Sequence, residues 1–334
     1  MNIALSNIAW LAPFVGIAKG EDVQGNVRTI IKTVGLPLAG LLVFLMIWSA
    51  AASNINTSLG QFPGPADVLT QSKGLISEHI AEREKAEAFY ERQEQRNADR
   101  VAKDPSYEPK IRPYTGKPTY VDQIGTSLVT VLSGFVLASL IAIPLGIVIG
   151  LSANLYSAFN PVIQIFKPVS PLAWLPIVTM VVSALYVSDD PMVPKSFVTS
   201  MITVMLCCLW PTVINTAVGV ASIPKDLVNV SQVLRLNYME HVRKIVLPSS
   251  IPMVFTGLRL SLGIAWMVLI AAEMLAQNPG LGKFVWDEFQ NGSSDSLGRI
   301  MVAVITIGLI GFLLDRLMLT VQRYVSWDKA STLR

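Results

Sequence analysis

Residues 224 to 252, PKDLVNVSQVLRLNYMEHVRKIVLPSSIP, form a charged, amphipathic stretch between two long apolar spans. Leu227, Val230, Leu234 and Tyr238 recur at spacings of three and four residues, which predicts a short helix with one apolar face. Prolines near the end of the stretch stop it just before the next span. A chain that only had to reverse direction would need about 5 residues here. The stretch is therefore predicted to be a docking surface for another protein.

The composition around this stretch is that of a membrane protein. Hydrophobic residues make up 52% of the 334 residues and charged residues only 15%. A helix needs about 20 apolar residues to cross the hydrocarbon core. Six such windows occur, the third of them short, with residues 155–166 expected to lie at the membrane interface and lead into it. These windows are residues 34–52, 128–151, 172–187, 197–220, 251–275 and 300–319.

The charges of the loops predict the orientation in the membrane. With the N-terminus inside, the cytoplasmic segments carry a net positive charge and the opposite loops a net negative one. The positive-inside rule then places both termini and residues 224–252 in the cytoplasm. Residues 1–33 have no basic side chain before Lys19 and an apolar part too short to span, so they are expected to be an interfacial or cytoplasmic arm.

The only sizeable polar region is the external loop of residues 53–123. Within it, residues 77–103 are rich in Glu, Arg, Lys and Ala, which predicts a solvated helix. Four prolines that follow predict an extended connection into the second span. The near-neutral charge of the loop argues against binding nucleic acid. The loop is interpreted either as a spacer on the outer face or as a seat for an external partner.

Motifs for catalysis are missing from the sequence. A phosphate-binding loop has no match, since Gly282 and Lys283 are followed by Phe284 and Gln277 stands where the first glycine is required. Neither hydrolase motifs nor zinc-ligand spacing occurs, and the only cysteines are the adjacent pair Cys207 and Cys208. We therefore expect no enzymatic activity, no bound cofactor or metal, and ATP binding only in a partner subunit.

A few polar side chains lie within the apolar windows and are candidates for a translocation path. Thr212, Asn215 and Thr216 in the fourth window are expected to face a helix or an aqueous path. Arg259 is interpreted as an anchor that snorkels or bonds to the preceding loop, or else as an anion ligand. Glu273 lies about 21 Å further along the same helix, too far to pair with Arg259, and is interpreted as a gate or packing contact at the outer mouth.

At residues 224–252 the pattern resembles the coupling loop of ABC importer permeases, whose signature is EAA, three residues, Gly, nine residues, then Ile, any residue, Leu-Pro. The end matches as Ile245-Val246-Leu247-Pro248, while Asn229-Val230-Ser231 stand at the EAA positions and Arg235 at the glycine. Three further segments are similar to the nitrate, sulfonate and bicarbonate permease family, and most to its nitrate branch. They are KPVSPLAWLPIV (residues 167–178), FTGLRLSLGIAWMVLIAAEML (255–275) and NPGLGKFVWDEFQ (278–290).

This resemblance implies an all-α membrane protein with six transmembrane helices and the type I ABC importer permease fold. It implies a bacterial inner-membrane location, a permease core over residues 124–324, a cytoplasmic tail over 325–334 and an insertion over about 77–117. The partners implied are two ATPase subunits, an external solute-binding protein, a second copy of the chain and membrane lipid. The coupling helix would then contact an ATPase subunit through Val230, Ser231, Val233, Leu234, Arg235 and Leu236.

The function that follows is ATP-driven import of a small inorganic anion, nitrate first, with nitrite, cyanate or bicarbonate next. Import of sulfonates such as taurine is the nearest alternative. An ion-coupled secondary transporter would require paired intramembrane charges and inverted repeats, which the sequence does not display. A membrane scaffold that transports nothing would leave the polar positions of the fourth and fifth windows unexplained.

Overall fold

The computed structural model describes residues 13, 16–17, 20, 22–57, 60–104, 106–187, 193–293 and 295–325. Most of the expected N-terminal arm before residue 22 and nearly all of the expected tail lie outside the described residues. The described elements, in chain order, are α2 (Val23–Ile30), the π-helical turn η1 (Ile31–Gly35), α3 (Leu36–Asn54), β1 (Asn56–Thr57), β2 (Gly60–Gln61), α4 (Pro65–Lys103), α5 (Tyr120–Gly150), α6 (Ala153–Phe166), α7 (Pro171–Leu185), α8 (Lys195–Ala221), α9 (Lys225–Val233), α10 (Tyr238–His241), the π-helical turn η2 (Val242–Val246), α11 (Leu247–Ala276), α12 (Leu281–Asn291) and α13 (Ser296–Val325).

Five helical stretches of the described chain are long and apolar enough to cross a membrane. Four of them contain an expected window, and Tyr120–Gly150 covers all but the last residue of the window 128–151, so five of the six predicted spans are present. The first stretch begins at Val23, so its helix starts before the apolar window that begins at residue 34. The stretches are Val23–Asn54, Tyr120–Gly150, Lys195–Ala221, Tyr238–Ala276 and Ser296–Val325.

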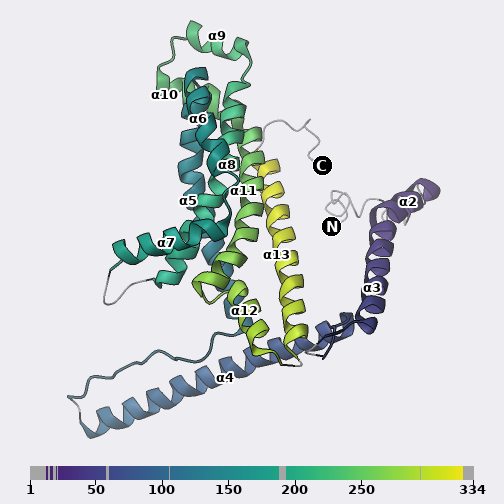
Figure 1. The fold of residues 1–334 in the computed structure, drawn as a ribbon, viewed down its shortest axis with the longest axis vertical. Coiled ribbons are helices and arrows are strands. Elements are labelled where there is room, and N and C mark those ends of the chain that lie inside the picture. The colour runs from purple at the N-terminus through teal and green to yellow at the C-terminus, as the bar shows by residue number, and fades with distance from the viewer. Residues whose placement is uncertain are drawn as a thin grey trace.

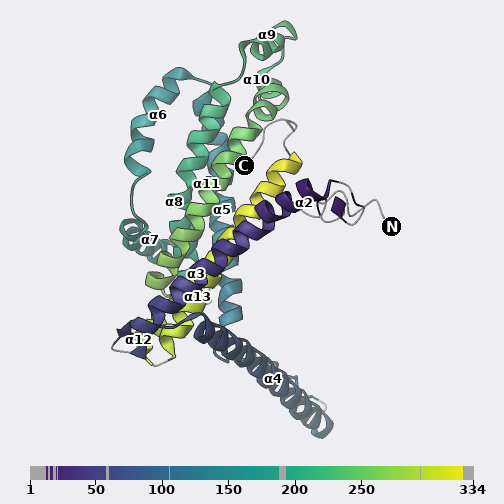
Figure 2. The ribbon, with the colours of Figure 1, turned by 90° about the vertical axis from the view of Figure 1, so that its right-hand side faces the viewer.

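The third expected span differs from the prediction because it is broken. Helices α6 and α7 meet at an angle of 97° and together satisfy the length and hydropathy of one span. Figure 2 shows α6 running down beside the bundle instead of lying flat at its end, with α7 turned across. Pro168 and Pro171 prevent a continuous helix at the junction, and the Ser170 hydroxyl accepts a hydrogen bond from the Leu172 N–H at 3.3 Å to start α7.

The core of the bundle is formed by α5, α8 and α11. Small residues bring these helices together: a Cβ added to Gly146 of α5 would lie 2.6 Å from Thr216 Cβ of α8. A Cβ on Gly257 of α11 would lie 2.9 Å from Asn215 Cβ and 3.0 Å from Thr212 Cα, both on α8. Such contacts supply the attraction between helices that lipid tails do not. Gly146 of the second span and Gly257 of the fifth therefore pack against α8 within one protomer.

Helices α2 and α3 stand away from this bundle, as Figure 1 shows. None of the residues in the apolar window of this first span is buried in the protomer. The exposed side chains of α3 include Leu42, Phe44 and Ile47, at 59%, 60% and 64% exposure. Trp48 tethers the end of α3 by donating its indole N–H to the Pro63 carbonyl at 3.2 Å.

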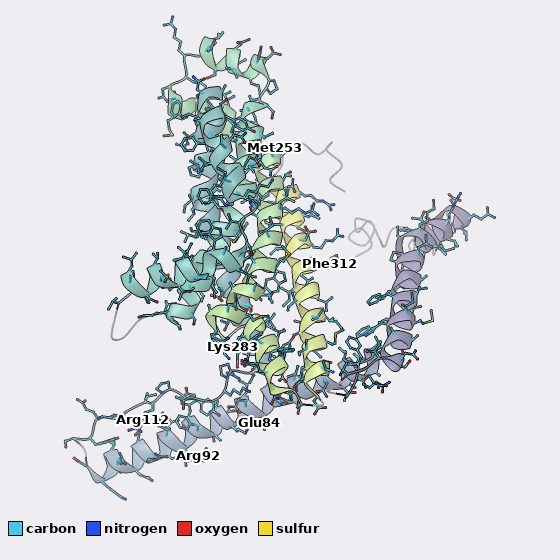
Figure 3. All side chains as sticks on the ribbon, viewed as in Figure 1. Glu84, Arg92, Arg112, Met253, Lys283 and Phe312 are labelled. Carbon is cyan, nitrogen blue, oxygen red and sulfur yellow. The ribbon has the colours of Figure 1, made fainter. Side chains whose placement is uncertain are left out.

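Helix α4 is a long arm that leaves the bundle at the end opposite α9 (Figure 1). Figure 3 places Glu84 and Arg92 on this arm and Arg112 on the extended segment that returns beside it. The return segment is held to the helix by hydrogen bonds, including Arg112 N–H to Gln93 Oε1 at 2.9 Å and Tyr114 O–H to Glu82 Oε1 at 2.7 Å. The predicted solvated helix and extended connection are both present, and the helix begins at Pro65 instead of residue 77.

Candidate functional site

The segment between α8 and α11 projects from the end of the bundle opposite the α4 arm (Figure 1). Helix α9 follows Pro224, and its last turn presents apolar side chains to the outside. Val233 is 81% exposed and Leu234 62%, and Val230, Tyr238 and Met239 are exposed as well. We call these five residues the α9–α10 apolar surface. A contiguous exposed apolar patch of this kind, rimmed by charges, marks an interaction site in a folded protein.

Arg235 closes α9 in a backbone conformation that suits glycine. Its φ is 49°, in the left-handed region. The Arg235 N–H donates to the Gln232 carbonyl at 3.0 Å, and the Leu236 N–H donates to the Ser231 carbonyl at 3.1 Å. These two bonds form a Schellman motif with Arg235 at the position where glycine is preferred. The arginine therefore keeps the turn that the signature glycine would make, at a steric cost of about 1 kcal/mol.

Two of the predicted docking residues are not fully available to a partner. Ser231 is only 5% exposed, and its Oγ lies 2.7 Å from His241 Nδ1, so it braces the segment from inside instead of facing a partner. Leu236 is half-buried. Val230, Val233, Leu234 and Arg235 remain on the outside, and their contact with an ATPase subunit stays a prediction.

The polar side chains of α8 lie between helices. Thr212 Oγ1 is 2.7 Å from Ser261 Oγ of α11, and both residues are 1% exposed. Asn215 is half-buried and donates its amide to the Pro211 carbonyl of its own helix at 2.8 Å. Thr216 is fully buried against Gly146. These contacts hold the three side chains within and between helices of one protomer, and their place on a translocation path stays a prediction.

Glu273 is fully buried where α11, α5 and α12 meet. The Ser127 hydroxyl of α5 lies 2.9 and 2.8 Å from the two carboxylate oxygens. The Gly282 N–H donates to Glu273 Oε2 at 3.0 Å, and the Leu281 N–H donates to Ser127 Oγ at 2.8 Å. These are the first N–H groups of α12, where an acidic group is favoured by the helix dipole. Glu273 is therefore a packing contact that fixes the start of α12.

The glycines of the NPGLG stretch are explained by this network. A side chain on Gly280 would collide with the Glu273 carboxylate, and one on Gly282 would collide with the Ile270 carbonyl. Asn278, 1% exposed, donates its amide to Thr130 Oγ1 of α5 at 3.2 Å. The turn between α11 and α12 thus wraps tightly around the carboxylate and ties both helices to α5.

Arg259 of α11 forms an ion pair with Asp315 of α13. Its Nε and Nη2 lie 2.5 and 3.0 Å from the two Asp315 oxygens. The side chains are 34% and 38% exposed. The expectation that Arg259 bonds to the preceding loop is corrected, because the partner lies on another span. The pair borders a cavity of about 510 Å³ whose lining includes Thr256, Gly263 and Met267.

The sequence did not identify Asp315 as the partner of Arg259, or Ser127 as the partner of Glu273. Asp315 lies near the end of the sixth window, where a charge reads as a boundary residue, and only the packing of α13 on α11 brings it to Arg259. Ser127 comes one residue before the second window and pairs with Glu273 across 146 residues of chain. For the second pair the sequence offered one signal: the acidic Glu273 within an apolar window, together with the hydroxyl of Ser127 near a distant span.

An all-helical bundle of this kind, with an exposed amphipathic segment at one end, is a multi-pass membrane domain of the type I ABC importer permease fold. Over residues 142–326 the chain matches the family described as binding-protein-dependent transport system inner membrane component. The chain belongs to this family. It is therefore a translocation subunit of an ABC importer, located in the membrane.

Relatives with assigned transport roles agree with this family. The chain is 41% identical over 204 residues to the nitrate import permease protein NrtB of Synechococcus elongatus, covering 61% of this chain and 69% of the relative. NrtB of Leptolyngbya laminosa is 39% identical over 196 residues, with 59% of this chain and 65% of the relative covered. The bicarbonate transport system permease protein CmpB of Synechococcus elongatus is 34% identical over 291 residues, covering 87% of this chain and 88% of the relative.

Among solved structures, a chain of the MetNI methionine ABC transporter in an inward-facing conformation superposes with a TM-score of 0.52. The match covers 62% of this chain and 95% of that chain at 16% sequence identity. At this identity the likeness concerns the fold alone.

Proposed function

We propose that this chain is the permease subunit of an ATP-driven importer of a small inorganic anion, with nitrate as the first candidate. The observation that carries the proposal is the α9–α10 apolar surface in a chain of the binding-protein-dependent importer family. An importer permease without a phosphate-binding loop requires ATP hydrolysis in partner subunits. The surface is where such a partner would attach.

The chemistry of the segment suits this attachment. Val233 and Leu234 are exposed beside Lys225 and Arg243, so a partner groove with an apolar floor and an acidic rim would match it. The segment connects directly to α8 and, through α10 and η2, to α11, which are two of the three core helices. A rigid-body shift of an ATPase subunit would therefore move the centre of the bundle.

Nitrate is our first candidate because two NrtB relatives are 39% and 41% identical to the chain, but CmpB relatives are 34% and 38% identical, so identity alone does not separate nitrate from bicarbonate. The CmpB match covers more of the chain, so bicarbonate is the second candidate, ahead of nitrite, cyanate or a sulfonate. A second copy of the chain is proposed as the other half of the membrane domain. The exposed first span, α2–α3, offers surface for that copy or for lipid. A solute-binding protein would deliver the anion at the α4 end.

The first prediction tests the docking surface. Leu234→Glu places a charge on the apolar surface, and we expect loss of the ATPase subunit on purification and at least a tenfold loss of anion uptake. Val101→Glu, the same kind of change at a 38% exposed position on the α4 arm, is the matched control and should retain both. A Leu234→Glu protein that copurifies with the ATPase and transports normally contradicts the assignment.

The transported anion is identified by uptake of labelled nitrate into vesicles that contain the chain with its ATPase and binding protein. Competition with bicarbonate and with taurine ranks the candidates. Strict dependence on ATP is expected, and uptake that persists without ATP under an ion gradient would point to a secondary transporter.

A further inference from the structure

The ion pair between Arg259 and Asp315 would be costly in contact with lipid. Both side chains are about one-third exposed at the surface of the protomer, within helices that cross the membrane. Charged groups held against acyl chains are costly even when paired, because lipid supplies no hydrogen bonds for the remaining donors. The α11–α13 surface near this pair must therefore meet water or a second protein.

The exposed side chains along α11 and α13 near this pair also support contact with water or a second protein. The outer row of α13 consists of large apolar residues, Leu309, Phe312, Leu313 and Leu317, each more than half exposed. Figure 3 shows Phe312 on this row, one turn before Asp315. The outer row of α11 alternates the small or polar Thr256 and Gly263 with the exposed apolar Leu260 and Met267. The row of α13 suits lipid, whereas the α11 row borders the 510 Å³ cavity and can face a path.

Arg259 keeps unused hydrogen-bonding capacity at this cavity. Its Nε and Nη2 donate to Asp315, but Nη1 has no acceptor within the described part of the chain. A guanidinium has five N–H donors in one plane, which match two oxygens of a planar oxyanion. Gly263 adds no side chain to the cavity, and a Cβ built there would meet nothing within 4 Å. The cavity therefore has a fixed cationic donor and open space beside it.

Resting on the proposed function, we propose that Arg259, oriented by Asp315, contacts the oxyanion during its passage along the α11 surface. The substrate class is a small planar oxyanion such as nitrate or bicarbonate. Asp315 has two roles in this arrangement: it fixes the plane of the guanidinium, and it offsets the positive charge. Conduction requires binding that is strong enough for entry and weak enough for release. A lone guanidinium in this environment would hold the anion too tightly.

The test uses the complete complex, with ATPase subunits and binding protein, reconstituted in vesicles. Arg259→Gln and Arg259→Lys should each lower nitrate uptake more than tenfold, while assembly and thermal unfolding stay as in the wild type. Hydrolysis of ATP stimulated by the loaded binding protein should remain within about twofold of wild type, because the proposed docking surface lies on α9 and α10, outside α11, and Arg259 is about three turns into α11. Arg316→Gln is the matched control and should transport normally, since Arg316 stacks on Phe312 at 5.0 Å and is outside the cavity lining.

Exchanging the two charges distinguishes a ligand role of Arg259 from a purely structural ion pair. The double variant Arg259→Asp with Asp315→Arg restores an ion pair between α11 and α13 but moves the guanidinium off its position on α11. A ligand role predicts that uptake stays more than tenfold reduced, and a purely structural role predicts recovery to within about twofold. Recovery, or normal uptake by Arg259→Lys, overturns this inference. A wild-type complex that carries neither nitrate nor bicarbonate contradicts the proposed function instead.

Discussion

Helix α11 carries two charged side chains in very different environments. Glu273 is fully buried, and its carboxylate oxygens accept hydrogen bonds from Ser127 and Gly282. Arg259, about four turns away along the same helix, is one-third exposed beside a cavity and has donors to spare. A buried charge whose bonds are all satisfied locks helices together, whereas a half-exposed charge with spare donors is available to a ligand. The contacts favour a structural role for Glu273 and support the proposed contact of Arg259 with the anion.

The largest effect is expected when the buried carboxylate is removed. Glu273→Leu leaves the Ser127 hydroxyl and the Gly282 N–H without an acceptor, and we expect a loss of about 3 kcal/mol or more in the free energy of unfolding. In detergent this corresponds to a fall of about 5 to 10 °C in the unfolding midpoint.

The same measurement on Arg259→Gln should show a shift of less than about 2 °C, because the side chain is partly in contact with solvent. Equal losses of stability in the two variants would remove the distinction between the buried and the half-exposed charge.

A smaller effect is expected at the hydroxyl that holds Glu273. Ser127→Ala removes a donor to the carboxylate and the acceptor for the Leu281 N–H, and should cost about 1 to 3 kcal/mol. Ser139→Ala in the same helix is the control, because that hydroxyl only donates to the Phe135 carbonyl of its own helix at 2.7 Å. Thermal unfolding in detergent measures the stability of both variants. If Ser139→Ala is as unstable as Ser127→Ala, the hydrogen bonds of Ser127 to Glu273 and Leu281 contribute no particular stability.

Much of the fold could be predicted from the sequence because transmembrane helices depend on local composition. Apolar windows, prolines and loop charges are read directly along the chain, and the windows for five spans coincide with helices of the described chain. The broken span was harder, since the turn between α6 and α7 depends on Pro168 and Pro171, which lie between the interfacial stretch 155–166 and the third window. The helix of the first span also begins before its apolar window, and Arg28 and Lys32 lie on the turns that lead into the apolar part.

The candidate site was predicted less completely because its contacts join distant parts of the chain. The apolar spacing of residues 227 to 238 is a local signal, and it located the exposed surface at Val233 and Leu234. The inward orientation of Ser231 depends on His241, which reaches it only after the chain turns at Arg235. The spacing of apolar residues along the sequence therefore predicts an exposed surface more readily than it predicts the hydrogen bonds beneath that surface.

The smallest effect is expected at Glu82, an acidic side chain on the α4 arm, outside the membrane spans. The hydrogen bond from Tyr114 lowers the pKa of the Glu82 carboxyl below its ordinary value of 4.5, and Lys85, at 3.4 Å, acts in the same direction. A carboxyl with a lowered pKa in the folded state stabilises that state above its ordinary pKa. The contribution is lost as the pH falls through the lower folded-state pKa.

The attachment of the return segment to α4 should therefore weaken between about pH 5 and pH 3. Amide hydrogen exchange of residues 110 to 116, corrected for the intrinsic effect of pH, should show a loss of protection of about two- to tenfold over this range. Tyr114→Phe should lower protection at neutral pH and remove most of the pH dependence, because the phenol is the main cause of the shift. Tyr107→Phe, which removes only an acceptor for Arg100 at 3.2 Å, should leave the pH dependence intact. If both variants titrate like the wild type, Glu82 does not hold the segment, and this carboxylate on the arm differs from Glu273 in having no structural role.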